Sequence, residues 1–183
     1  MPLPAPTARK HKHTRQVTCE GFQREDGLWD IEGHLVDTKA EQLALPDKTL
    51  MVGEPLHDMA IRLTVDLSLT IHTVETTMDS TPYAMCSGIA PLYKQLVGES
   101  IRPGFTKRVR DLFGGTKGCT HLVELLGPIA TTAIQVTFQE RHRLAKSSDE
   151  SPVSEQLNSC HTYAADSQVV KTHWPELYRG DGT

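Results

Sequence analysis

The sequence predicts an α+β fold in which a four-stranded antiparallel sheet is followed by about three helices packed on one face. Three observations support this prediction. Apolar and polar residues alternate over 17–39 and again over 59–78, as in strands with one buried face. Turn signals interrupt both stretches, and after Cys86 the apolar spacing becomes that of helices. Strands grouped before helices are typical of α+β domains.

The first two strands are predicted as a hairpin over 15–39. Asp26-Gly27 is a turn signal, and the second strand begins near Trp29. Trp29 and Ile31 share one parity in that strand, so we expect both to be core residues that face the last helix. The opposite, polar side of the strand carries Asp30, Glu32 and His34.

The next two strands come from an alternation that begins at Met59 and keeps its parity to Ile71. This stretch is either one bent strand or, as we favour, a second hairpin that turns near 66–68. Residues 40–56 contain two prolines and a glycine, which predicts a loop. Three helical stretches follow, and the last is the clearest, with apolar residues spaced from Leu122 to Val136.

Composition sets the expected boundaries and excludes some functions. Residues 1–14 are predicted as a disordered arm, 15–145 as one domain, 146–155 as a linker, and 156–183 as a tail that packs back on the domain. The net charge of −4 argues against nucleic-acid binding. Since no apolar run is long enough to span a membrane and the start does not resemble a signal peptide, we expect a cytoplasmic protein with free thiols. Whether it forms a homo-oligomer stays open.

The most informative motif is Gly118-Cys119-Thr120-His121, just before the last helix. A helix start has unpaired N–H groups and a positive dipole end, which favours thiolates, anions and metals. Cys86 also precedes a helical stretch, so we expect Cys119, His121 and Cys86 to share one site. The alternative is that the cysteines are packing residues, because free cysteine is among the most buried residue types.

Further candidates lie on the strands. His57 beside Asp58 is the pattern of a general base with an orienting carboxylate, although adjacent strand residues point to opposite faces. His34 and Arg62 belong to polar strand faces that either line a substrate pocket or are solvated surface. Asp37 and Lys39, at a strand end, could contact an anion or a substrate. Whether Cys160-His161 in the tail joins the site is left open.

Three long motifs resemble an uncharacterised bacterial family of unknown function. They cover nearly the whole chain and read Gly-Leu-Trp-Asp-Ile-Glu-Gly at 27–33, Glu-Pro-Leu-His-Asp-Met at 54–59 and Gly-Cys-Thr-His-Leu-Val-Glu-Leu at 118–125. This resemblance implies a role in the bacterial catabolism of aromatic compounds.

Residues 57–140 are also remotely similar in architecture to the iron–sulfur cluster scaffold family. Cys86 matches the cysteine after the strands of that family, residues 96–101 match a helix end, and Cys119 matches the cysteine that opens the last helix. The remaining scaffold cysteine has no counterpart in the 40–57 loop, where Glu54, His57 or Asp58 would have to replace it. That difference favours a zinc or iron ion over a cluster.

The leading hypothesis is a small-molecule enzyme, an acid–base lyase that acts on an aromatic, lignin-type compound, for example by eliminating a small aldehyde. His121 or His57 would move the proton, while Arg62 or Lys39 would hold an anionic group. One alternative is a metal-binding scaffold or carrier with Cys86, Cys119 and His57 around one zinc or iron ion. Another is a binding module without catalysis. The sequence leaves the cofactor open between none and one such ion.

Overall fold

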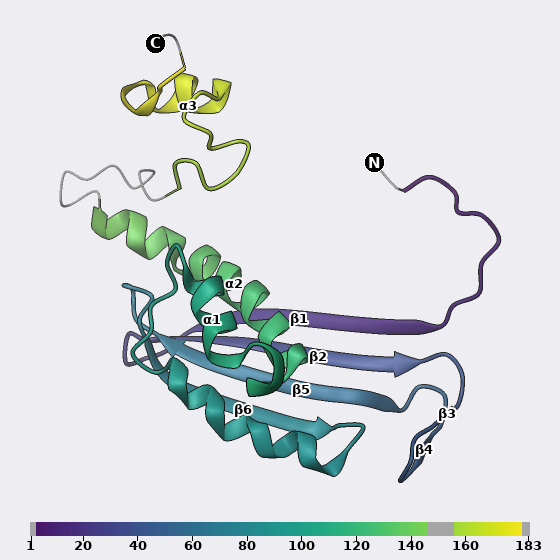
Figure 1. Cartoon of the computed structure of the whole chain (residues 1–183). Helices are drawn as coiled ribbons and strands as arrows, with labels where there is room; N and C mark the ends of the chain where they lie inside the picture. The colour runs from purple at the N-terminus through teal and green to yellow at the C-terminus, as the bar shows by residue number, and fades with distance from the viewer. Residues whose placement is uncertain (1–2, 146–155, 181–183) are drawn as a thin grey trace. The chain divides into compact units, whose positions relative to one another are not determined.

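The computed structural model describes residues 3–145 and 156–180 and confirms the predicted α+β fold. Contacts divide the chain into two units, Met1–Val136 and Thr137–Thr183. A four-stranded antiparallel sheet of order β1-β2-β5-β6 forms the first unit together with the helices that follow it (Figure 1). Its strands are β1 (His13–Gln23), β2 (Trp29–Lys39), β5 (Pro55–Val65) and β6 (Ile71–Ser80).

Both predicted hairpins are present. Gly27 has a positive φ of 85° in the turn between β1 and β2, a conformation that costs glycine little. The long alternation after Met59 divides into β5 and β6, with the backbone N–H of Leu69 donating to the carbonyl of Asp66 in the turn. The loop predicted over 40–56 contains a second small sheet, β3 (Leu43–Ala44) with β4 (Thr49–Leu50).

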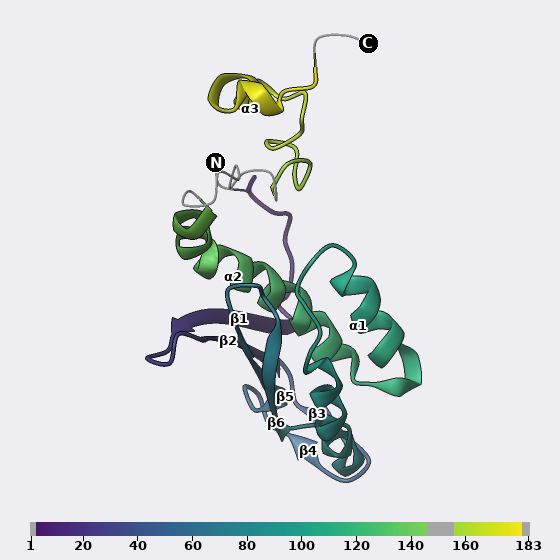
Figure 2. The same cartoon turned by 90° about the vertical axis from the view of Figure 1, so that its left-hand side faces the viewer.

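The helices gather on one face of the four-stranded sheet (Figures 1 and 2). They are η1 (Ala84–Leu96), α1 (Phe105–Phe113), η2 (Gly115–Lys117) and α2 (Thr120–Ala145). The first is a 3₁₀ helix that includes Pro91, a residue without the N–H that an α-helix needs. Because this helix begins at Ala84, Cys86 lies within its first turn rather than before it. No helix in the described ranges is both long and apolar enough to cross a membrane.

The core lies between the helix-facing side of the sheet and α2, and it includes Trp29 and Ile31, as predicted. Gly33 has the same parity, and a Cβ at this position would lie 2.5 Å from the side chain of Ile129. Glycine at this point therefore lets α2 approach the sheet closely. The part of α2 up to Val136 belongs to the first unit. The first turn of α2 lies over the end of the sheet that holds Asp37 and His57.

The predicted boundaries remain predictions. β1 begins at His13, two residues inside the predicted arm, and the predicted linker 146–155 lies outside the described residues. Residues 156–180 contain α3 (Gln168–His173) and η3 (Pro175–Leu177). The Ser167 hydroxyl caps α3 by accepting from the backbone N–H of Val170.

Candidate functional site

Three neighbouring strands place polar side chains in one row at the end of the sheet. Arg15 is opposite Asp37 across β1 and β2, and Asp37 is opposite His57 across β2 and β5. Asp37 has the parity of buried Leu35, and His57 has the parity of buried Met59. Since residues of one parity share a face, the row continues the apolar side of the sheet that α2 covers.

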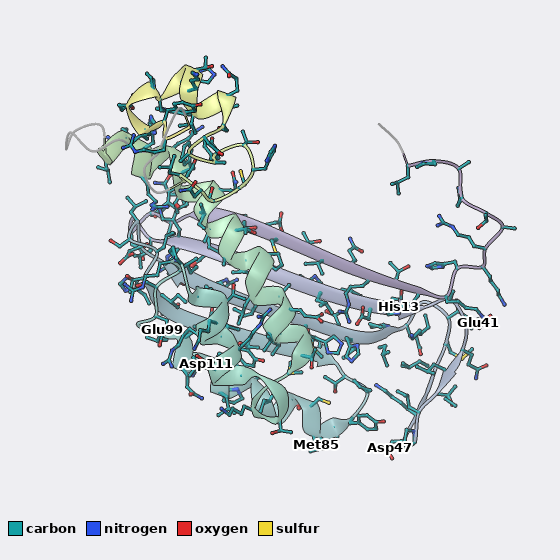
Figure 3. The ribbon with its side chains drawn as sticks, turned by 45° about the horizontal axis from the view of Figure 1, so that its top comes forward. His13, Glu41, Asp47, Met85, Glu99 and Asp111 are labelled. Carbon is teal, nitrogen blue, oxygen red and sulfur yellow. The ribbon has the colours of Figure 1, made fainter. Side chains whose placement is uncertain are left out.

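Asp37 is the centre of this arrangement, with only 1% of its surface exposed. Arg15 donates from Nε to Oδ1 and from Nη2 to Oδ2, both at 2.8 Å. His57 Nδ1 lies 2.9 Å from Oδ2. His13, labelled at the start of β1 in Figure 3, has Nε2 3.2 Å from Oδ1, and His121 has Nε2 3.7 Å from Oδ2. One buried carboxylate therefore faces four side chains with ring or guanidinium nitrogens.

His121 reaches this carboxylate from the first turn of α2. Its ring lies on that of His57, with centroids 3.8 Å apart and a tilt of 35°. Its Nδ1 is 3.8 Å from the Cys119 sulfur. The buried hydroxyl of Tyr93 fixes Cys119, donating to its carbonyl at 3.1 Å and accepting from its N–H at 3.0 Å. The start of α2 is thus held in place beside the row on the sheet.

Burial and charge shift the pKa values of the central groups. Burial acts to raise the pKa of Asp37, but the hydrogen bonds and charge of Arg15, followed by those of His57, outweigh it and lower the pKa to about 2. Burial lowers the pKa of His57, although Asp37 opposes this effect. Burial, followed by the charges of His57 and Arg15, also lowers the pKa of His121. At neutral pH the site therefore holds an ionised carboxylate between two neutral imidazoles.

These protonation states fix the tautomer of His57. A carboxylate only accepts hydrogen bonds, so the hydrogen between the two groups belongs to Nδ1 of His57. Nε2 then carries a lone pair that is available to take a proton. This is the arrangement of a general base whose ring is oriented by a carboxylate.

The opposite, open face of the sheet holds two other predicted residues, His34 and Asp58. Their side chains contact each other, with His34 Nε2 2.6 Å from Asp58 Oδ1. Asp58 follows His57 in the sequence but points to the other face, so the carboxylate beside His57 is Asp37 instead. A hollow of about 310 Å³ lies next to His34, lined also by Thr18, Glu20, Glu32, Gly33 and Ala60.

Arg62 and Lys39 lie away from the row. Arg62 is on the open face, where its guanidinium binds Glu32 at 2.8 Å and Glu75 at 2.7 Å. Lys39 is the last residue of β2, and its carbonyl accepts from the N–H of Gly53. Among the residues that the structure describes, the ion pairs and hydrogen bonds of the Asp37 carboxylate are with Arg15, His13, His57 and His121, not with Arg62 or Lys39.

Asp37, His57 and His121 also form a group of possible metal ligands. Within residues 3–145 and 156–180, one ligand atom from each lies within 4.8 Å of the others. Of the metal set predicted from the sequence, only His57 belongs to this group. The Cys119 sulfur contacts one member of the group, His121. Cys86 lies in η1 and is not a member of the group.

Sequence reasoning missed the central position of Asp37 and the part played by Arg15. A signal was present, because the apolar parity of Trp29, Ile31 and Leu35 continues to Asp37. A carboxylate on an otherwise apolar strand face has to find buried partners. Following parity to the ends of the strands would have placed Asp37 and His57 on one face.

A family model described as a protein of unknown function (DUF2889) matches residues 13–135. The chain belongs to the DUF2889 family. The match begins at His13 and includes the whole row on the sheet and the first turn of α2. No curated protein and no solved structure matches the chain. The similarity to iron–sulfur scaffolds therefore finds no support, and membership of DUF2889 brings no known activity.

Proposed function

We propose that this DUF2889 protein is a small-molecule enzyme that works by acid–base chemistry at Asp37, His57 and His121. The observation that carries the proposal is the buried hydrogen bond of 2.9 Å between Asp37 and His57 Nδ1. It leaves Nε2 of His57 free to accept a proton and stabilises the imidazolium that forms. Because burial lowers the pKa of His57, the ring is neutral and active as a base at pH 7.

The reaction that suits this base is a lyase reaction on an aromatic alcohol, the substrate class implied by the sequence resemblance. His57 takes the hydroxyl proton, and the carbon that bears the oxygen leaves as a small aldehyde. The electron pair of the broken carbon–carbon bond stays on the remaining carbon, which takes up the proton that His57 removed, so that both histidines end neutral. His121, whose ring is tilted by 35° against that of His57, is the second group that can relay this proton.

Arg15 is the cation available to an anionic group of the substrate. Its Nη1 leaves the row and binds Glu124 on α2 at 2.6 Å, and about a third of its side chain, 36%, is exposed. Its Nε and Nη2 bind Asp37, the same carboxylate that His57 contacts. Arg62 and Lys39, which the sequence suggested for this task, are not in contact with Asp37.

The proposal is tested by measuring aldehyde release from a panel of phenolic alcohols with purified protein. His57→Asn and His121→Asn are expected to lose turnover while circular dichroism and the unfolding midpoint stay close to those of the parent. His34→Asn, a histidine beside a carboxylate on the open face, is the matched control and should keep full turnover. Variants that unfold but keep activity per folded molecule would make His57 and His121 structural residues.

The second candidate function is a metal centre, favoured by the approach of three ligand atoms to within 4.8 Å of one another. Two neutral imidazoles and one carboxylate suit zinc or iron. Arg15 competes for both oxygens of Asp37, which is why we rank this candidate second.

Metal analysis of untagged protein decides between the two candidates. Stoichiometric zinc or iron that is lost in His57→Asn supports the metal centre. Undiminished turnover after chelation supports the acid–base enzyme. A binding module without catalysis gains if neither metal, turnover nor ligand binding responds to these variants.

A further inference from the structure

The outer edge of β1 is long, regular and open. β1 pairs with β2 over 11 residues without a register shift and, in the described part of the chain, has no strand on its other side (Figures 1 and 2). Natural edge strands are usually protected by bulges, prolines, lysines or a covering segment. The stretch His13–Gln23 has no bulge, no proline and no lysine. Such an edge is a template for pairing with another strand.

The residues whose backbone groups point outward can be identified. At one end of the β1–β2 ladder the N–H of Arg24 donates to the carbonyl of Leu28, and at the other the N–H of Ala40 donates to the carbonyl of Lys12. Hydrogen-bonded pairs alternate along an antiparallel ladder, so even-numbered residues of β1 bond to β2. The N–H and C=O groups of the odd-numbered residues from Arg15 to Gly21 therefore point away from the sheet.

The other edge of the sheet differs, because the chain itself covers the start of β6. Ile71 donates its N–H to the carbonyl of Glu99 and accepts from the N–H of Gly98. The N–H of Ile101 donates to the carbonyl of Leu69, and Thr70 forms a bridge with Ser100. Two register shifts also interrupt the pairing of β5 with β6. Of the two edges, β1 is thus open along its whole length, whereas β6 is covered at its start.

We propose that β1 pairs antiparallel with β1 of a second copy of this chain, around a two-fold axis at Thr18, joining the two sheets into one. A pair in which each copy uses its own β1 edge closes on itself and cannot propagate into a fibre. The axis stands perpendicular to the sheet, so both copies keep α2 on the same face. Thr18 is then opposite Thr18 of the second copy.

The sequence of β1 is complementary to itself in this register. Val17 lies opposite Cys19 on the helix-facing side, Gln16 opposite Glu20 on the open side, and Thr14 opposite Phe22. Val17 and Phe22 are 43% and 47% exposed in the single chain, so pairing covers two apolar side chains. Within His13–Gln23 no like charges face each other, and Arg15 is opposite Gly21 with its guanidinium turned to Asp37 and Glu124 of its own chain. This complementarity favours a second copy over an unrelated strand.

The first test measures the mass of the full chain by light scattering and sedimentation at micromolar concentration. The expected result is a dimer for the parent and for Val17→Thr, which keeps the outward N–H. Val17→Pro removes that N–H without touching a hydrogen bond to β2 and should be a folded monomer by circular dichroism. A monomeric parent, or a Val17→Pro variant that is still a dimer, would overturn the proposal.

The second test fixes the register. Opposed residues of a non-hydrogen-bonded pair have Cα atoms about 4.5 Å apart, within the range of a disulfide. Under mild oxidation Thr18→Cys should therefore form a covalent dimer that reductant reverses. Thr77→Cys, on the exposed side of β6, is the control and should stay uncrosslinked beyond the background of the native cysteines. Equal cross-linking of the two variants would contradict an axis at Thr18.

Discussion

The same two strands, β2 and β5, carry two histidine–aspartate pairs on opposite faces of the sheet. On the open face His34 contacts Asp58 at 2.6 Å, and the two side chains are 51% and 30% exposed. On the face under α2 His57 contacts Asp37 at 2.9 Å, with exposures of 11% and 1%. The residue types and the strands are the same, so the environment alone separates the two pairs.

This difference shows what makes a pair of side chains into a candidate site. Beneath α2, Asp37 has Arg15, His13 and His121 around it in addition to its histidine. Burial acts to raise the pKa of Asp37, but the hydrogen bonds and charges of Arg15 and His57 outweigh it and hold the pKa at about 2. On the open face water screens the charges, and such exposed pairs contribute little. Contact distance by itself ranks the exposed pair first, at 2.6 Å against 2.9 Å.

The difference between the two faces is tested most directly by replacing His57 and His34 with asparagine, one at a time. His57→Asn should lower aldehyde release by about 100- to 10,000-fold, the usual contribution of a general acid–base group. His34→Asn should leave it unchanged, since that ring lies on the other face. Steady-state kinetics on both variants measures this, with active protein counted by its unfolding transition. Equal losses in the two variants would remove the functional distinction between the faces.

The second comparison replaces the two carboxylates, Asp37 and Asp58, with asparagine in separate variants. Asp37→Asn leaves Arg15 and His57 without a charged acceptor and should lower the free energy of unfolding by about 2–4 kcal/mol. Asp58→Asn should cost less than about 1 kcal/mol, as expected for an exposed pair. Urea denaturation at pH 7 measures both. If the two costs are the same, the network around Asp37 is not stronger than a surface contact.

The third comparison exchanges glycines instead of charged residues. Gly33→Ala adds a methyl group 2.5 Å from Ile129 and should cost about 1–3 kcal/mol through overpacking. Gly127→Ala is the matched control, because a Cβ there meets nothing within 4 Å, and it should stabilise α2 by about 0.5–1 kcal/mol. Thermal unfolding of both variants gives the sign of each effect. A stabilising Gly33→Ala would mean that α2 does not lie tightly against the sheet.

The sheet and its turns were predictable because parity and turn residues are local signals, as the positions of Trp29 and Ile31 show. The site was predictable only in pieces. His57, His121 and Asp37 each stand out by residue type, but their meeting depends on β5 pairing with β2 as well as with β6, which follows it in the sequence. Adjacency in the chain suggests Asp58 as the partner of His57, whereas the actual partner, Asp37, is 20 residues away.

Arg15 shows a further reason why the site could not be completed from the sequence. An arginine on a polar edge strand is usually solvated, and nothing around Arg15 in the sequence marks it otherwise. Its acceptor Asp37 is 22 residues away, and its second acceptor Glu124 is 109 residues away. Only the folded sheet with α2 above it brings the three together.

The smallest expected effect is on the pH dependence of stability, and it also separates the two faces. Burial lowers the pKa of His57 and His121 from their usual 6.5, so below pH 6.5 the unfolded chain binds protons that the folded chain does not. Stability therefore falls as the pH decreases from 6.5 towards the lower pKa values of the folded state. Asp37 adds a second loss of the same sign between its usual 3.8 and about 2.

Urea denaturation between pH 8 and pH 5 measures the histidine contribution. The free energy of unfolding of the parent should be constant above pH 7 and decrease towards pH 5. In a variant carrying both His57→Asn and His121→Asn, it should decrease less over that interval. His34→Asn should follow the parent curve, because the buried rings that it retains cause the loss. A parent that gains stability on acidification would show that the two imidazoles are protonated in the folded state. In that case Asp37 would lie between two cations, and His57 could not act as the base at neutral pH.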